Sequence, residues 1–263
     1  MKSKLNAPVA VFDAGIGSYS IVARIRDTWP DKDIVYFADR ASFPYGRKNA
    51  DELTHVMMRT IGLLEQFDPS GIVIASNAPS IMVLEEVRKL SPVPISGVLP
   101  PVAEAIEASK NGHVGVMGVA SLIESRMFAD FITPFAGHAK VSGFNASRAI
   151  DHVENGDFLF AREKTAQSVK HLVDEIFQRD PDIDVLTLSS THLPWLRDYF
   201  EAAAPHCTFL DPADSVVAAL DIGPMGSGIT HAIATEAPGF EIAEFEKMLG
   251  QIGVDLRIEK VTL

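Results

Sequence analysis

Cysteine is almost absent from the sequence. The single thiol, Cys207, cannot form an internal disulfide and has no metal-ligand spacing around it. The chain also lacks a recognisable signal peptide and any apolar run near the roughly 18 residues that a membrane span needs. Basic residues are few, since 23 Lys and Arg stand against 35 Asp and Glu, for a formal net charge of −12. We therefore expect a cytoplasmic protein without a nucleic-acid, membrane or metal partner.

What is present is typical of a globular α/β protein. The 263 residues are 47% hydrophobic, enough to bury a sizeable core. Short apolar runs that suit buried strands alternate with longer segments whose apolar residues recur every three or four positions, as in helices packed on a sheet. The strands predicted in this way are Val9–Asp13, Ile34–Ala38, Ile72–Ser76, Val93–Val98, His113–Gly118, Ala139–Phe144, Val185–Ser189 and Thr208–Leu210. The predicted helices are Ser20–Trp29, Ala50–Phe67, Pro79–Leu90, Val102–Lys110, Ser121–Phe131, Ala149–Arg179 with a break near Asn155-Gly156, Pro194–Ala204 and Ala213–Leu220.

The alternation starts again near Pro100-Pro101, which can punctuate a boundary. The strands and helices before and after this point thus form two series, or rounds. In each round a strand ends in a small polar residue, as GIVIASNAP at 71–79 and DVLTLSSTH at 184–192 show. We therefore predict two pseudo-symmetric α/β domains, each a mostly parallel sheet flanked by helices, with an active-site cleft between them. The predicted domains are residues 1–100 plus 212–263, and residues 101–211. Within the first, the tail is expected to add a helix at Glu241–Leu249 and an edge strand at Asp255–Val261.

The loop DAGIGS at residues 13–18 follows a predicted strand and precedes a predicted helix, so its backbone N–H groups are placed to hold an anion. It is not a dinucleotide-binding loop, because Ser20 stands where the G-x-G-x-x-G pattern needs its third glycine. Two interpretations remain open. The glycines form a tight turn in which Asp13 caps the helix, or Asp13 is a strand-end carboxylate that acts on a ligand.

Two loops, SNAP at 76–79 and STHLP at 190–194, occupy equivalent places in the two rounds. Their hydroxyl and amide groups suit a carboxylate ligand, but helix N-capping by the same side chains is the simpler explanation. His192 fits a partly buried, satisfied histidine as well as an acid/base group. A serine-hydrolase triad has weak support, because no G-x-S-x-G elbow surrounds either serine.

Three further polar segments have ordinary structural explanations. FPYG at 43–46 fits a turn, although a tyrosine between proline and glycine can also close over a small ligand. Glu154 stands at the end of a predicted helix, where a solvated carboxylate is the default expectation. The acidic run DPDID at 180–184 is expected to be a solvated turn.

Taken in order, these segments resemble the glutamate racemases of the aspartate/glutamate racemase superfamily, over nearly the whole chain. The family's D-S-G-x-G-G-x-S opening is matched by DAGIGSYS at 13–20, and its A-D and F-P-Y-G elements by residues 38–39 and 43–46. Its C-N-T-A corresponds to SNAP at 76–79 and its G-C-T-H-x-P to SSTHLP at 189–194. VENG at 153–156 matches a V-x-E-x-G-like element loosely.

The resemblance implies a cofactor-independent enzyme in which two cysteines, one on each face of the substrate, remove and return an α-proton. Those thiols fall at Ser76 and Ser190 here, and Cys207 matches neither position. The supporting acid/base groups that the resemblance implies are Asp13, Glu154 and His192. The substrate-binding positions that it implies are Ala14, Pro44, Tyr45, Gly46, Asn77, Ala78 and Thr191.

The missing thiols change the expected chemistry. A free thiol has a pKa near ~8.5 and is easily poised for proton transfer at neutral pH, whereas an unassisted serine hydroxyl ionises far above it. Ala14 and Ala78 also lack hydroxyls with which the family binds its substrate. We predict a glutamate racemase-like protein that binds a small carboxylate or amino acid and whose racemisation is lost or altered. The alternatives are a non-catalytic binding or regulatory protein, and a thiol-independent isomerase or lyase on another small acid; a homodimer is left open.

Overall fold

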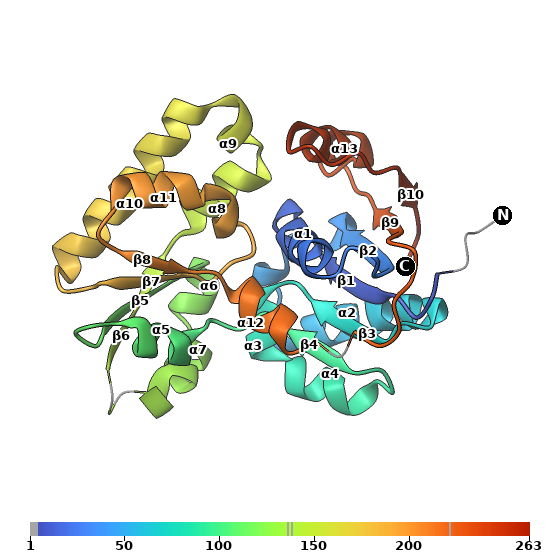
Figure 1. Ribbon diagram of the computed structural model, residues 1–263, viewed down its shortest axis with the longest axis horizontal. Coiled ribbons are helices and arrows are strands. Elements are labelled where there is room, and N and C mark those ends of the chain that lie inside the picture. The colour runs from blue at the N-terminus through green and yellow to red at the C-terminus, as the bar shows by residue number, and fades with distance from the viewer. Residues whose placement is uncertain (1–4, 136, 138, 221) are drawn as a thin grey trace. The chain divides into compact units, whose positions relative to one another are not determined.

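The computed structural model describes residues 5–135, 137, 139–220 and 222–263. The chain divides into two compact units, one made of Met1–Val98 with Val216–Leu263 and the other of Leu99–Ser215. Each unit contains its own parallel sheet with helices packed against it (Figure 1). The predicted fold class, α/β with mostly parallel sheets flanked by helices, is confirmed. None of the described helices combines the length and apolar character that crossing a bilayer requires.

The first unit has a six-stranded sheet in the order β10-β9-β2-β1-β3-β4, in which every neighbouring pair is parallel. Its strands are β1 (Val9–Asp13), β2 (Ile34–Asp39), β3 (Gly71–Ile74), β4 (Ile95–Gly97), β9 (Thr230–Thr235) and β10 (Ile258–Lys260). Its helices are α1 (Tyr19–Thr28), α2 (Ala50–Leu64), α3 (Asn77–Met82), α4 (Leu84–Leu90) and α13 (Ile242–Gln251). Because the strands are parallel, the loops that follow β1, β2 and β3 leave the same edge of the sheet side by side.

Residues on both faces of the central strands are buried, which explains their continuous apolar runs. On one face, the ring of Tyr36 contacts Tyr19 of α1 and Phe245 of α13, with centroid separations of 5.4 and 6.4 Å. Its neighbour Phe37 points the other way, into a cluster that includes Met57 of α2. Figure 1 shows the same division, with α1 and α13 on one side of the sheet and α2 and α4 on the other.

The second unit has a four-stranded parallel sheet in the order β6-β5-β7-β8. Its strands are β5 (His113–Gly118), β6 (Lys140–Asn145), β7 (Val185–Leu188) and β8 (Thr208–Leu210). Its helices are α5 (Val102–Ala108), α6 (Ala120–Ile123), α7 (Arg126–Ile132), α8 (Ser147–Glu154), α9 (Asp157–Phe160), α10 (Arg162–Arg179) and α11 (Arg197–Ala203), while α12 (Pro212–Ala218) contains the point at which the chain returns to the first unit. Val116 of β5 packs with Val102 of α5 and Phe128 of α7.

The structure adds one strand to the predicted elements and divides two of the predicted helices. The tail contributes β9 as well as the predicted helix and edge strand, and β9 pairs with β2 inside the sheet. The second difference concerns helices that are interrupted: predicted Pro79–Leu90 divides into α3 and α4, and Ser121–Phe131 into α6 and α7. The break expected near Asn155-Gly156 is confirmed, since Gly156 adopts a φ of 74°, which favours glycine.

Candidate active site

Asp13 lies at the carboxyl end of β1, between the two neighbouring strands that carry the other predicted residues of this unit. It aligns with Ala38 of β2, and on the other side the N–H of Ala75 donates to the carbonyl of Phe12 at 2.8 Å. Ser76 therefore starts its loop beside Asp13. Asp13 is buried, and the N–H of Gly15 lies 3.4 Å from its Oδ2.

Ser76 and Asn77 occupy the turn from β3 into α3. Ser76 is at the N-cap position, yet its hydroxyl makes no capping hydrogen bond, so the capping explanation of this serine is wrong. Asn77 is 6% exposed and its Nδ2 donates to the carbonyl of Val98 at 2.9 Å. Its Oδ1 is buried and has no hydrogen-bond partner among the described residues. The amide orientation is fixed, because a backbone carbonyl accepts only from the nitrogen. Ala78, the next residue, is also buried.

The turn after β2 brings Tyr45 into the core rather than to the surface. Pro44 and Gly46, on either side of it, are half-buried. The Tyr45 hydroxyl donates to Oδ2 of Asp39 at 3.1 Å, and both side chains are buried. Burial raises the pKa of Tyr45 well above its usual value, and the negative charges of Asp39 and Asp13 raise it further. This hydroxyl is therefore neutral at physiological pH and acts as a donor that fixes the loop.

Two residues of this region were missed by sequence reasoning. The guanidinium of Arg40 donates to the carbonyl of Ala14 at 2.9 Å and stacks over Phe245, 4.9 Å from the ring centroid. It thereby ties the loop after β1 to the strand beside it. Thr235 at the end of β9 donates to Oδ1 of Asp39 at 2.8 Å. Only recognition of β9 as a strand parallel to β2 would have suggested this second contact.

The second unit brings together Ser190, His192 and Glu154, which are 8%, 7% and 8% exposed. Ser190 follows β7, and its Oγ lies 3.4 Å from Nδ1 of His192. On the other side of the ring, Nε2 lies 3.0 Å from Oε2 of Glu154 at the end of α8. His192 thus lies between Ser190 and Glu154, and the solvated helix end expected for Glu154 is not observed. Thr191, between the serine and the histidine, is 3% exposed.

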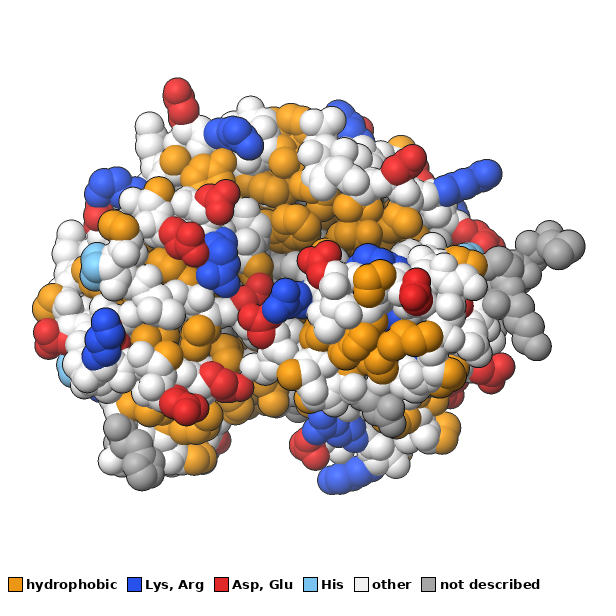
Figure 2. Space-filling view, viewed as in Figure 1, with side chains coloured by type: hydrophobic (Ala, Val, Ile, Leu, Met, Phe, Trp, Pro, Cys, Tyr) orange, Lys and Arg blue, Asp and Glu red, His pale blue; other side chains and the backbone are white. Residues whose placement is uncertain are grey.

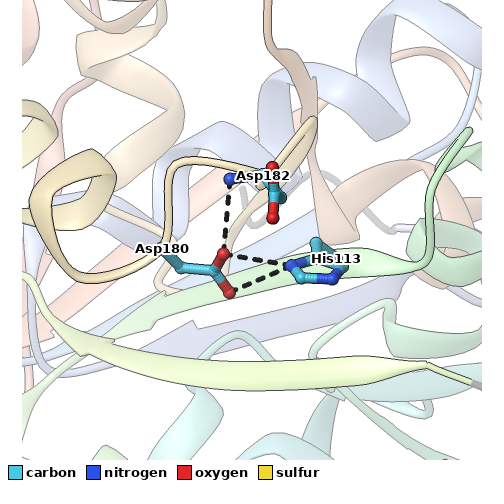
Figure 3. Close-up of side chains that lie close together, drawn as sticks. All are labelled: His113, Asp180 and Asp182. Atoms are coloured by element: carbon cyan, nitrogen blue, oxygen red, sulfur yellow. Dashed lines mark hydrogen bonds and ion pairs between the residues drawn. The ribbon is translucent and has the colours of Figure 1, made fainter.

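A cluster of His113, Asp180 and Asp182 lies elsewhere in the second unit, at the amino end of β5 (Figure 3). One ligand atom from each residue lies within 4.8 Å of the others. Asp180 is 3% exposed and already accepts from Lys140 at 2.9 Å and from His113 at 3.0 Å. The solvated-turn prediction is therefore wrong for Asp180, which is a buried ion-pair partner. A lysine ammonium in contact with the carboxylate explains the cluster without a metal ion.

Charged side chains of both signs are interspersed on the face drawn in Figure 2. A hollow in the first unit lies at the carboxyl ends of β2, β9 and β10, where Asp39, Thr235 and Lys260 contribute to its lining. Lys260 is paired there with Glu236. None of the sequence-predicted site residues is among those that line this hollow.

The chain has two α/β units, each with a parallel sheet, and carries acid, hydroxyl and imidazole groups at the ends of its strands. These features indicate a protein of the amino-acid racemase class. The model of the Asp/Glu/Hydantoin racemase family matches residues 19–220, and the chain belongs to this family. Glutamate racemase of Desulforudis audaxviator is 30% identical over 224 residues, covering 84% of this chain and 81% of that protein.

Solved structures show the same fold. Glutamate racemase isoform RacE1 from Bacillus anthracis superposes with a TM-score of 0.85 and 23% identity, over 99% of both chains. Escherichia coli glutamate racemase, solved in complex with L-glutamate and the activator UDP-MurNAc-Ala, gives a TM-score of 0.81 and 21% identity over 98% of this chain and 99% of that one.

Proposed function

We propose that the chain binds a small carboxylate or amino acid at the carboxyl ends of its strands and does not carry out two-thiol racemisation. The observation that carries the binding proposal is the amide of Asn77, whose buried Oδ1 has no partner among the described residues. Leaving a buried acceptor unsatisfied costs about 1–3 kcal/mol, which a ligand donor recovers. An α-ammonium group supplies such a donor.

The neighbourhood of Asn77 fits the same kind of ligand. Asp13, on the adjacent strand, adds a carboxylate, and the Ser76 hydroxyl is not used to cap the helix. The carboxylate, amide oxygen and hydroxyl together suit an ammonium group. The Escherichia coli relative was solved with L-glutamate, an amino acid that contains one, and this supports choosing amino acids as the first ligands to test.

The loss of two-thiol chemistry rests on Ser76, Ser190 and the state of the remaining cysteine. Serine at the two family thiol positions cannot be poised near neutral pH without assistance. Cys207 does not replace them, because burial, followed by the charge of Asp184, raises the pKa of its thiol to about 12. It also precedes β8, and so lies at the amino end of a strand parallel to the one that Ser190 follows.

The experiment is a thermal-shift screen with L- and D-glutamate, L- and D-aspartate, alanine, succinate and malate, followed by calorimetric titration of any hit. A ligand that binds the folded state at about 100 times its Kd stabilises it by about 2.7 kcal/mol. We expect at least one amino acid to raise the melting temperature, and Asn77→Ala to abolish that rise. Gln178→Ala, which removes an exposed amide from α10, is the matched control. If no compound raises the melting temperature at saturating concentration, the binding proposal is contradicted.

The catalytic half of the proposal is tested separately. Bound amino acids are incubated in D₂O and α-proton exchange is followed by NMR. We expect saturable binding with exchange no faster than in buffer. Enzyme-dependent exchange at the α-carbon by the unaltered chain would show that proton abstraction survives without thiols.

A further inference from the structure

Ser190, His192 and Glu154 form a hydrogen-bonded row of the kind that activates a serine hydroxyl. The Glu154 carboxylate only accepts hydrogen bonds, so the proton between it and the ring is carried by Nε2 of His192, 3.0 Å away. That tautomer leaves the lone pair on Nδ1, 3.4 Å from the Ser190 Oγ. The ring is therefore oriented to accept the serine proton.

Burial and the backbone reinforce this arrangement. The His192 and Glu154 side chains are 9% and 7% exposed, so their contact is largely removed from competing water. The backbone N–H of His192 is also directed at the Ser190 Oγ, at 3.4 Å. An N–H donor at this position stabilises negative charge as the hydroxyl gives up its proton. Separations of this length are common in unliganded sites and shorten when a substrate is bound.

Other serines at strand ends lack this environment. Ser189, the preceding residue, pairs its hydroxyl with Thr187 at 2.7 Å instead of a histidine. Ser76 has no histidine in its loop. Glu154 and His192 are 38 positions apart in the sequence, so no short motif such as the G-x-S-x-G elbow could reveal their contact.

We propose that Ser190 is a nucleophile that hydrolyses small carboxylic esters through an acyl-serine intermediate, with His192 as general base and acid and Glu154 as the positioning residue. Oγ attacks the ester carbonyl carbon as its proton moves to Nδ1. Collapse of the tetrahedral intermediate breaks the bond to the alcohol oxygen, which leaves with the proton from His192. Water then attacks the acyl group, gives a proton to Nδ1, and releases the acid as Ser190 regains its hydrogen.

Every group in this activity belongs to the second unit, so its assay does not depend on Asn77 of the first unit, on which the binding proposal rests. It is tested with p-nitrophenyl acetate, following release of p-nitrophenolate. We expect Ser190→Ala to remove the enzyme-dependent rate, and His192→Gln to lower it about 100-fold, the lower end of the usual contribution of a general base. Ser189→Ala is the matched control and should retain the rate.

Glu154→Gln separates positioning from a structural effect. We expect it to lower kcat for ester hydrolysis at least tenfold with little change in KM and in melting temperature. Labelling supplies a second readout: a fluorophosphonate should add one equivalent, located on Ser190 by peptide mass spectrometry, at a rate reduced in both His192→Gln and Glu154→Gln.

The proposal is overturned if the unaltered protein shows no rate above buffer, or if Ser190→Ala hydrolyses the ester as fast as the unaltered chain. Acylation that maps to lysines and not to Ser190 would overturn it equally. Because these assays do not involve Asn77 or any amino acid, failure of the ester-hydrolysis proposal is distinguishable from failure of the binding proposal.

Discussion

The hydroxyl of Tyr45 lies 3.1 Å from Oδ2 of Asp39, and both residues are buried at the carboxyl end of β2. The other carboxylate oxygen accepts from Thr235 of β9 at 2.8 Å. Thr235 in turn accepts from the N–H of Ala41 at 3.0 Å. One buried carboxylate thus joins a strand from the start of the chain, a strand from its end and the turn between β2 and α2, so loops beside the candidate site depend on it.

The first prediction concerns Tyr45→Phe. Removing the hydroxyl leaves buried Asp39 with one donor fewer, and we expect a loss of about 1–3 kcal/mol of unfolding free energy at neutral pH. Because the pKa of Tyr45 is raised in the folded state, its contribution is complete below about pH 10 and is lost as pH rises further. The variant should therefore show a shallower alkaline decline in urea unfolding. Tyr199→Phe, whose hydroxyl donates to the carbonyl of Phe158, is the control; an unchanged alkaline slope in Tyr45→Phe would contradict the assignment.

The second prediction concerns Asp180→Asn. Burial raises the pKa of Asp180, but hydrogen bonds from Lys140 and His113 outweigh it and hold the pKa below its usual value. A lowered pKa means stability that is present above about pH 4 and is lost as pH falls through the folded-state value. We expect Asp180→Asn to cost about 1–2 kcal/mol at pH 7, a modest figure because Lys140 is more than half exposed, and to flatten the acid decline.

Urea unfolding of Asp180→Asn and of Asp182→Asn between pH 7 and pH 3 checks this prediction. The neighbouring Asp182 is exposed, so its variant should keep the acid slope of the unaltered protein. We further expect neither EDTA nor Zn²⁺ to change the melting temperature of the protein, since the Lys140 ammonium already contacts the buried carboxylate of Asp180. A chelator-sensitive melting temperature that becomes insensitive in Asp180→Asn would show that the cluster holds a metal.

Strands with a strong local signal were predicted well from the sequence. Val9–Asp13, His113–Gly118 and Thr208–Leu210 have in the structure the same bounds that were predicted for them. By contrast, β9 reads THAIAT, in which two alanines and a histidine separate the three β-branched residues, so it has no long apolar run, and its place in the sheet comes from pairing with β2. Tertiary contact, not local pattern, decides such a strand.

The candidate site shows the same limit. The rule that ligand loops follow parallel strands places Asp13, Ser76 and Ser190 correctly at carboxyl ends, because it depends only on strand direction. Ser190 and His192 are two residues apart, so their contact is local. The contact of His192 with Glu154 requires α8 to be docked beside the turn after β7, and no spacing in the sequence encodes that docking.

The third prediction is that the unaltered protein does not rapidly interconvert L- and D-glutamate. The resemblance implies that Ser76 and Ser190 stand where the family has its thiols. An unassisted serine hydroxyl ionises far above neutral pH, and general acid/base catalysis is worth about 100-fold or more. We expect a rate at least about 100-fold below that of a two-cysteine glutamate racemase assayed beside it. The measurement follows optical rotation with protein purified from a host without its own glutamate racemase; rapid racemisation there would refute the expectation.

The last prediction asks whether the thiols are all that the scaffold lacks. If Ser76 and Ser190 occupy the positions of the two family bases, Ser76→Cys with Ser190→Cys should restore α-proton exchange on an amino acid. Each single variant should exchange one enantiomer only, because each base acts on one face of the substrate. His192, in contact with residue 190, is placed to stabilise a thiolate there when protonated.

Deuterium uptake by both enantiomers, measured for the two single variants and the double variant, distinguishes the outcomes. Ser189→Cys is the control, since it adds a thiol one residue away from the family position. If the double variant is inactive but gains exchange when Ala14→Ser and Ala78→Thr are added, the missing hydroxyls had also dismantled the substrate site. If neither combination exchanges any tested amino acid while circular dichroism shows an intact fold, the chain keeps only the binding function of its family. A base positioned over an α-carbon would have exchanged its proton.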